Sequence, residues 1–465
     1  MTHLKKKALN GWMIALINVA AVCNIKNFPL LAEYGLAIVL FLILSAIFFF
    51  LPIAFVSAEL SSAWPDRGVY TWVRTALGPR MGFLAIWLQW ISNVIWYPTI
   101  LSFIAATFAY IIDPDLATNK TYVMSIILVA FWAATFINFL GMRVSGWISS
   151  LTALFGTILP IALIIFLGAV WIFGDHPSQI AFTWDAIFPD LSSMNQLVLL
   201  SGVLLGLAGL EMSAVHARDV RDPRRDYPRG IFLSAFLIII FSILGALAIA
   251  AIVPSKEIEL ASGGMEAFRL LFVAFKMPWA TPIIAAVTFI GALGMMSTWI
   301  VGPSRGLLAT AEHGDLPPCF HKVNAKGMPI NILLAQAVIV TALSLVFLFM
   351  PSVNSSYWAL VALASILYQV MYIIMFISAI VLRHKHPMLE RPYRIPCGDA
   401  GIWVVGLLGM IGASFGLYFG FFPPSQFDTG KLLTYEGFLI GGSLLFCILP
   451  LWIFTVRKSS WHKKQ

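Results

Sequence analysis

The sequence predicts an all-α integral membrane protein with twelve transmembrane helices. Three observations carry this prediction: an apolar composition, a regular recurrence of long apolar stretches, and an uneven distribution of basic residues. Hydrophobic residues make up 60% of the 465 residues and charged residues only 11%, with a mean hydropathy of +0.90. A soluble domain of this composition would expose large apolar patches to water. We therefore expect the lipid bilayer to be the protein's solvent.

Apolar stretches long enough to cross a bilayer, about 20 residues each, recur twelve times with short connections. No segment between them is long enough to form a soluble domain. The predicted spans are 10–34, 36–60, 81–111, 121–141, 147–173, 195–216, 229–253, 281–304, 329–350, 356–382, 402–421 and 436–456.

The basic residues predict the orientation of these spans. With the N-terminus inside, 23 of the 29 Lys and Arg residues fall in inner segments, five fall in outer loops, and Lys26 falls within a span. Because inner loops of membrane proteins are rich in Lys and Arg, both termini are predicted to be cytoplasmic and the protein to lie in the inner membrane. The net charge of +8 is explained by this topology, so we expect no nucleic-acid partner.

Other classes of site lack support in the sequence. The four cysteines (Cys23, Cys319, Cys397 and Cys447) are scattered without a CxxC pair, so we expect neither a metal site nor a cofactor. No HExxH motif occurs, and later spans offer no serine–histidine pair, which argues against an intramembrane enzyme. No charged ring or filter sequence suggests a channel.

Ionisable residues inside spans are costly, and each is a candidate for function. Lys26 lies in the first span, within a polar segment that ends in a proline, Cys23-Asn24-Ile25-Lys26-Asn27-Phe28-Pro29. Either the helix is kinked and Lys26 pairs with a carboxylate, or it is unwound and lines a cavity. Glu33 and Glu59 fall at span ends, where we expect their carboxylates to reach water.

Glu211 lies deep in the sixth span, in Gly206-Leu207-Ala208-Gly209-Leu210-Glu211. The glycines allow either close helix packing or the close approach of a ligand. The first and sixth spans lead two consecutive blocks of five. Interrupted segments at matching positions of two halves point to the site of a secondary transporter, where unpaired backbone groups face a polar cavity. Such a site suits a zwitterionic amino acid.

Several motifs resemble those of the amino acid–polyamine–organocation transporter superfamily over nearly the whole chain. The Glu211 segment, Leu210-Glu211-Met212-Ser213-Ala214-Val215-His216, is similar to that of its bacterial glutamate/γ-aminobutyrate antiporter family. The other motifs are Ala58-Glu59-Leu60-Ser61-Ser62-Ala63-Trp64-Pro65-Asp66-Arg67-Gly68, Asp222-Pro223-Arg224-Arg225-Asp226-Tyr227-Pro228, Ser304-Arg305-Gly306, His313-Gly314-Asp315-Leu316-Pro317-Pro318 and Arg391-Pro392-Tyr393-Arg394-Ile395-Pro396.

The resemblance implies one transporter domain, residues 1–465, with a 5+5 inverted repeat (about 10–173 and 195–382), discontinuous helices 1 and 6, and two extra helices (about 402–456). It also implies alternating access, with exchange or proton-coupled uptake of amino acids. A positive Lys26 favours acidic or neutral amino acids. The alternatives are a basic amino acid or polyamine exchanger, or a transporter-like nutrient sensor. Substrate pair, stoichiometry, proton coupling and oligomeric state stay open.

The residues proposed for the site follow from these arguments. Unpaired backbone groups of both interrupted segments would hold the substrate's carboxylate and amine, and Lys26 would supply positive charge or pair with Glu211. Aromatic side chains would complete the cavity, and Glu211 or His216 would couple transport to protons. The predicted binding residues are Ala21, Val22, Cys23, Asn24, Lys26, Gly206, Leu207, Ala208, Gly209, Trp96, Tyr97, Trp299, Tyr368 and Tyr372.

One departure concerns the C-terminus. The antiporter family's acid-resistance member closes its cytoplasmic mouth with a long C-terminal tail. This sequence ends at Gln465, about nine residues after the twelfth predicted span. We therefore expect neither a plug of that kind nor the pH gating that depends on it.

Overall fold

The computed structural model describes residues 10–64, 68–140, 154–174, 176–188, 194–212, 220, 222, 225–426 and 428–462. Helices dominate these ranges, as predicted. In the first half they include α1 Gly11–Val22, η1 Ile25–Asn27, α2 Phe28–Ala32, α3 Ile38–Ser45, η3 Ala46–Phe50, α4 Leu51–Ala63, α5 Val69–Leu77, α6 Pro79–Ile112, α7 Lys120–Asn138, η5 Leu154–Ile158, α9 Leu159–Phe173 and α10 Met194–Leu207. The second half contains α11 Asp226–Ile252, η8 Ser255–Glu257, α12 Gly263–Ala274, α13 Ala280–Glu312, α14 Ile330–Ser344, α15 Val346–Phe349, α16 Val353–Lys385, α17 Gly398–Phe419 and α18 Leu432–Thr455.

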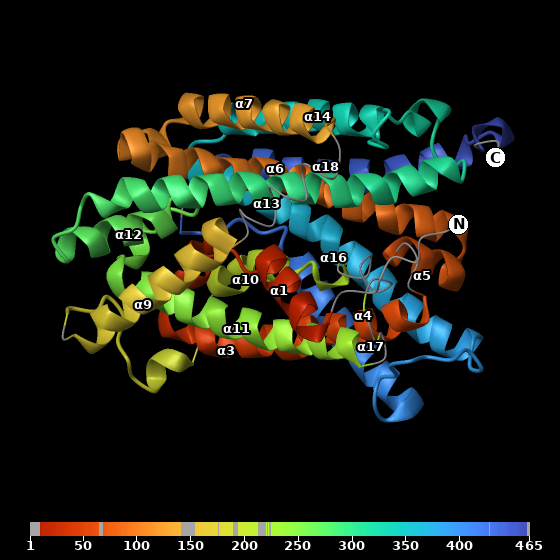
Figure 1. The fold of residues 1–465 in the computed structure, drawn as a ribbon, viewed down its shortest axis with the longest axis horizontal. Helices are drawn as coiled ribbons and strands as arrows, with labels where there is room; N and C mark the ends of the chain where they lie inside the picture. The colour runs from red at the N-terminus through yellow and green to blue at the C-terminus, as the bar shows by residue number, and fades with distance from the viewer. Residues whose placement is uncertain are drawn as a thin grey trace.

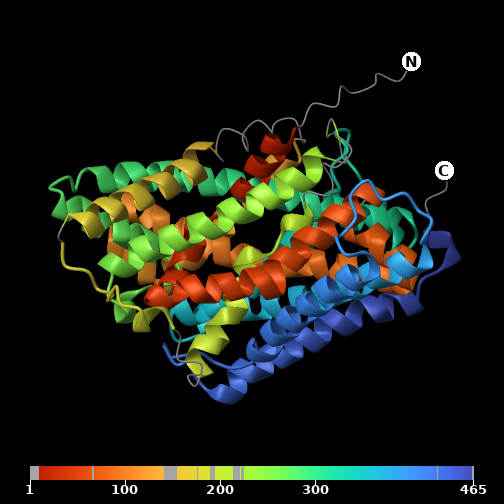
Figure 2. The same cartoon turned by 90° about the horizontal axis from the view of Figure 1, so that it is seen from below.

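The long helices run side by side along the long axis of the molecule (Figures 1 and 2). α6 and α16 form its centre. In the most apolar 18-residue stretch of each helix, 78% and 83% of the residues are buried, respectively. α18 lies along one side and has only 17% of its window buried, which leaves an apolar surface suited to lipid. α6 and α16 are therefore surrounded mostly by other parts of the protein.

Nine helices of the described residues are long and apolar enough to cross a membrane, or ten if the bent pair α1–α2 counts as one span. This agrees with the predicted class of multi-pass helical membrane protein. The predicted sixth and eighth spans contain the shorter apolar helices Gln196–Met212 and Ala280–Met296. The twelve-span count, the inverted repeat and its boundaries stay predictions.

Basic side chains gather at one end of the molecule. α5 and the residues after α18 lie at this end, and α12 lies at the other (Figure 1). Asp315, which is buried, joins the two basic elements: its carboxylate lies 3.5 Å from the Arg74 guanidinium and 2.9 Å from that of Arg457. This end carries the segments that the distribution of basic residues assigns to the inner side.

Glu59, at the end of α4, does not reach water, contrary to expectation. Its side chain is 2% exposed and accepts hydrogen bonds from the Arg383 guanidinium of α16 and, at 2.8 Å, from the Ile395 N–H. The Arg391 Nε lies 3.2 Å away. The segment after α16 folds back over the end of α4, and this contact between distant parts of the chain buries the carboxylate.

Two glycines allow two helices to come into direct backbone contact. A β-carbon added to Gly156 of η5 would lie 1.8 Å from the Cα of Gly291 in α13, and one added to Gly291 would lie 1.9 Å from the Cα of Gly156. The backbones therefore touch directly, as in the small-residue crossings of membrane helices. This crossing fixes the position of α13, which carries Trp299 into the cavity described below.

Candidate functional site

The first span is interrupted where the polar segment predicted a break. α1 ends at Val22, and Cys23 and Asn24 adopt extended backbone angles before η1 and α2 continue with a bend of 48°. The Asn24 side chain caps the new turn by accepting a hydrogen bond of 3.0 Å from the Lys26 N–H. The N–H groups of Asn24 and Ile25 find no partner in the described part of the chain, so donors remain available at the break.

The sixth predicted span also breaks at its glycines. α10 ends at Leu207, and Ala208 and Gly209 separate it from a short turn at 210–212. Gly209 has φ +117°, and a β-carbon there would lie 3.1 Å from the Trp299 ring. Position 209 therefore needs glycine for both its backbone angle and the neighbouring ring. At Gly206 a β-carbon would lie 3.3 Å from the Asn27 amide, which brings the two breaks together.

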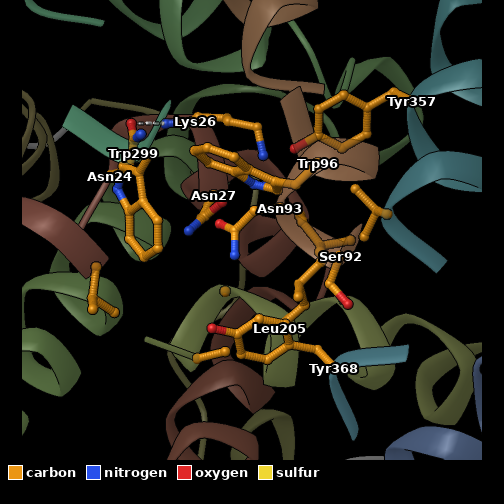
Figure 3. Close-up of a pocket in the computed structure, with 16 residues that line it drawn as sticks. Asn24, Lys26, Asn27, Ser92, Asn93, Trp96, Leu205, Trp299, Tyr357 and Tyr368 are labelled. Atoms are coloured by element: carbon orange, nitrogen blue, oxygen red, sulfur yellow. Dashed lines mark hydrogen bonds between the residues drawn. The ribbon is translucent and has the colours of Figure 1, made fainter. Parts of the chain in front are cut away.

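A cavity of about 60 Å³ lies between these breaks, with room for several water molecules. It is bounded by the first break, α6, α10, α13 and α16 (Figure 3). The lining residues are Val22, Asn24, Lys26, Asn27, Leu30, Ser92, Asn93, Trp96, Gly202, Leu205, Gly206, Ala208, Trp299, Tyr357, Val361 and Tyr368.

Lys26 is the one charged residue among the described residues of this lining. Its side chain is 2% exposed, and its ammonium lies 5.2 Å from the centre of the Trp96 ring and 4.9 Å from that of Tyr357. No carboxylate of the described residues pairs with it. Figure 3 shows the ammonium between these two rings. The rings stabilise the cation by their π-faces but do not neutralise it.

Glu211 lies outside the lining and has its own partners. Its carboxylate accepts hydrogen bonds from Tyr368 at 2.7 Å, Tyr372 at 2.6 Å and the Gln89 amide at 3.2 Å. The pairing of Lys26 with Glu211, which the sequence left open, is therefore not found. Because Tyr368 lines the cavity and also binds Glu211, its hydroxyl connects the cavity with the buried carboxylate.

The structure brings many of the predicted binding residues together. Val22, Asn24, Lys26, Trp96, Gly206, Ala208, Trp299 and Tyr368 line the cavity, and Leu207 lines a smaller cavity beside it.

Other predicted residues lie behind this lining. Tyr97 donates a hydrogen bond of 2.9 Å to the Trp299 carbonyl, and the Tyr372 hydroxyl accepts one of 3.0 Å from the Gly209 N–H. Cys23 is buried but does not line either cavity, and Ala21 lies in the last turn of α1. His216 lies outside the described residues.

Sequence reasoning missed four polar lining residues: Asn27, Ser92, Asn93 and Tyr357. Ser92 is 1% exposed, and its hydroxyl has no hydrogen-bond partner in the described structure. The Asn93 side-chain amide donates a hydrogen bond of 2.7 Å to the Gln89 backbone carbonyl. A signal was present, because Gln89, Ser92 and Asn93 share one face of a helix at i, i+3 and i+4.

In the described residues no group of His, Cys, Asp or Glu is arranged to hold a metal ion.

Comparisons with known proteins agree with these features. Residues 9–444 match the family model described as amino acid permease. An uncharacterized transporter of Legionella pneumophila is 45% identical over 460 residues, with 98% of each chain covered. A glutamate/gamma-aminobutyrate antiporter of Lactococcus lactis is 29% identical, covering 98% of this chain and 92% of its own. A probable agmatine/putrescine antiporter of the same species is 22% identical, covering 86% and 84%.

Proposed function

The chain belongs to the amino acid permease family, and on this premise we propose that it is a secondary active antiporter that exchanges amino acids by alternating access. These relatives are transporters and antiporters rather than enzymes. The observation that carries the proposal is the cavity between two broken helices, where N–H donors at one break and the Lys26 ammonium beside them have no hydrogen-bond or ion-pair partner among the residues that the structure describes. Inner-membrane localisation and cytoplasmic termini complete the proposal, supported by the distribution of basic residues.

The charge of the cavity supports acidic or neutral substrates, such as glutamate and γ-aminobutyrate. Lys26 would repel a dication, and Glu211 does not pair with Lys26, since its carboxylate accepts hydrogen bonds from Tyr368, Tyr372 and Gln89. The basic amino acid or polyamine exchanger remains the second candidate, since one relative is named an agmatine/putrescine antiporter. The two candidates predict opposite orders of preference between glutamate and putrescine.

We assign roles to the two breaks on physical grounds. The segments Ala21–Asn24 and Gly206–Gly209 would hold the α-carboxylate and amine of the substrate by their backbone groups. Trp96, Trp299 and Tyr368 would close around its side chain. Glu211 and His216 are the candidates for coupling transport to protons. Both belong to the 5+5 repeat that the family resemblance implies.

Counterflow in liposomes tests the proposal. Purified protein is reconstituted with an unlabelled amino acid inside, and uptake of a labelled one is followed in competition with the proteinogenic amino acids, γ-aminobutyrate and putrescine. Accumulation that requires internal amino acid means exchange. Uncoupled current would indicate a channel, and binding without flux a nutrient sensor. Competition by putrescine but not glutamate would favour the second candidate.

A further inference from the structure

We propose that Lys26 is a substrate-dependent proton carrier, protonated when the cavity holds an acidic amino acid and neutral when it holds a zwitterionic one. This inference rests on the proposed exchange function and deepens it. It assigns the proton to the cavity itself rather than to the buried Glu211. The site and its occupant would then carry no net charge in either loaded state.

The surroundings of Lys26 supply no permanent countercharge among the described residues. Trp96 of α6 and Tyr357 of α16 face the ammonium with their rings, and Asn24 is engaged with the Lys26 backbone N–H. The remaining titratable group of the lining is Tyr368 of α16. From the other packed elements, α11, α12 and α13, no carboxylate of the described residues forms an ion pair with this ammonium.

The glutamates of the neighbouring elements do not line the cavity. Glu211 is bound by two tyrosines and Gln89. Glu266 of α12 is held by Arg269 and Tyr110. Glu33, which follows α2, interacts electrostatically with the carboxylate of Glu259. Because no carboxylate of the described residues pairs with Lys26, we assign the negative charge that balances a protonated Lys26 to the substrate.

Electrostatics then couples the proton to the substrate. An isolated charge in a low-dielectric interior is costly unless an opposite charge joins it. The second carboxylate of an acidic amino acid supplies that charge, so the ammonium is retained. A zwitterion brings equal charges of both signs and leaves the cost uncompensated. While the cavity is open to water, the N–H bond of Lys26 breaks and its proton passes to a water molecule, and the nitrogen keeps the electron pair.

The stoichiometry follows from charge balance. In exchange of an acidic for a neutral amino acid, the anion enters with one proton and the zwitterion leaves without one, so the cycle is electroneutral and acidifies the lumen. Exchange of like for like moves no net proton. If Lys26 stayed protonated throughout, each exchange of an acidic for a neutral amino acid would move one net negative charge across the membrane. The luminal pH would then stay unchanged.

Two substitutions separate these cases. Lys26→Arg keeps a charge that does not dissociate in proteins, so it should lower γ-aminobutyrate–γ-aminobutyrate exchange more than glutamate–glutamate exchange. Lys26→Gln is always neutral and should do the reverse, with glutamate exchange reduced about tenfold or more, since a factor of ten corresponds to only about 1.4 kcal/mol. Size-exclusion elution and the unfolding temperature in detergent show whether each variant folds. Lys256, which is exposed in η8, gives matched controls as Lys256→Arg and Lys256→Gln.

The experiment uses liposomes containing a luminal pH dye, with the membrane potential set by potassium and valinomycin. In the wild type, external glutamate against internal γ-aminobutyrate should acidify the lumen at a rate that does not depend on the potential. Potential-dependent exchange without acidification would overturn the proposal, as would Lys26→Arg with wild-type proton movement. Absence of any amino acid counterflow in the wild type would instead refute the proposed function.

Discussion

Tyr372 links Gly209 to Glu211: its hydroxyl donates a hydrogen bond of 2.6 Å to the carboxylate and accepts one of 3.0 Å from the glycine N–H. All three residues are buried, and Gly209 and Glu211 lie at the break that follows α10. One side chain of α16 therefore satisfies both a backbone donor released by the break and the acidic group beside it.

Tyr372→Phe should destabilise the protein, because it leaves a buried N–H without a partner and removes one donor from Glu211. The expected loss is about 1–3 kcal/mol for an unsatisfied buried group. Thermal unfolding in detergent would measure it. Tyr418→Phe is the control, because the Tyr418 side chain is 60% exposed. Equal unfolding temperatures of the two variants would contradict the assigned role.

Glu59→Gln should cost more, about 3–5 kcal/mol, because it leaves the buried guanidinium groups of Arg383 and Arg391 without their carboxylate. The same unfolding assay applies. Asp399→Asn removes a carboxylate that is 60% exposed and lies 3.4 Å from the exposed Arg394 and 3.7 Å from Arg383. Because Arg383 keeps Glu59 in this variant, the cost should stay below about 1 kcal/mol. If Glu59→Gln unfolds no earlier than Asp399→Asn, the buried cluster does not stabilise the fold.

Gly291→Ala should disturb the contact between η5 and α13, since its β-carbon would lie 1.9 Å from the Gly156 Cα. Overpacking of this kind costs about 1–3 kcal/mol or more. The yield of monodisperse protein in size-exclusion chromatography is the measurement. Gly437→Ala in α18 is the control, because a β-carbon at that position would meet no described atom within 4 Å. Normal yield of Gly291→Ala would show that the backbones can separate.

Stability should fall in acid partly through Glu266 of α12. Burial opposes ionisation, but hydrogen bonds from Arg269 and Tyr110 prevail and hold the pKa of Glu266 below the ordinary value of 4.5. A lowered pKa contributes stability above the unfolded-state value, and that contribution is lost as pH falls through the folded-state value.

The unfolding temperature of the wild type, measured below pH 5, should therefore decline more steeply than that of Glu266→Gln. Glu257→Gln, at an exposed position of η8, serves as the control and should keep the wild-type decline. Parallel curves for all three proteins would remove Glu266 as a contributor.

The sequence predicted the elements that local composition controls. Apolar length gave the helices, and the polar run around Lys26 and the glycines before Glu211 located both breaks. What it missed depends on which helix face meets which neighbour. On α6 the sequence shows that Gln89, Ser92 and Asn93 share one face, but nothing local indicates that this face borders the cavity. Glu59 was expected to reach water, because nothing local indicates that Arg383 and Arg391 fold over it.

The two indole rings in the cavity have a practical consequence. Trp96 and Trp299 lie with their ring centres 5.9 Å apart and both line the cavity. A solute that enters displaces water from both faces and changes the local polarity, so their ultraviolet emission reports occupancy without any added dye. Replacing either ring by phenylalanine would identify its share of that optical signal among the 16 tryptophans of the chain.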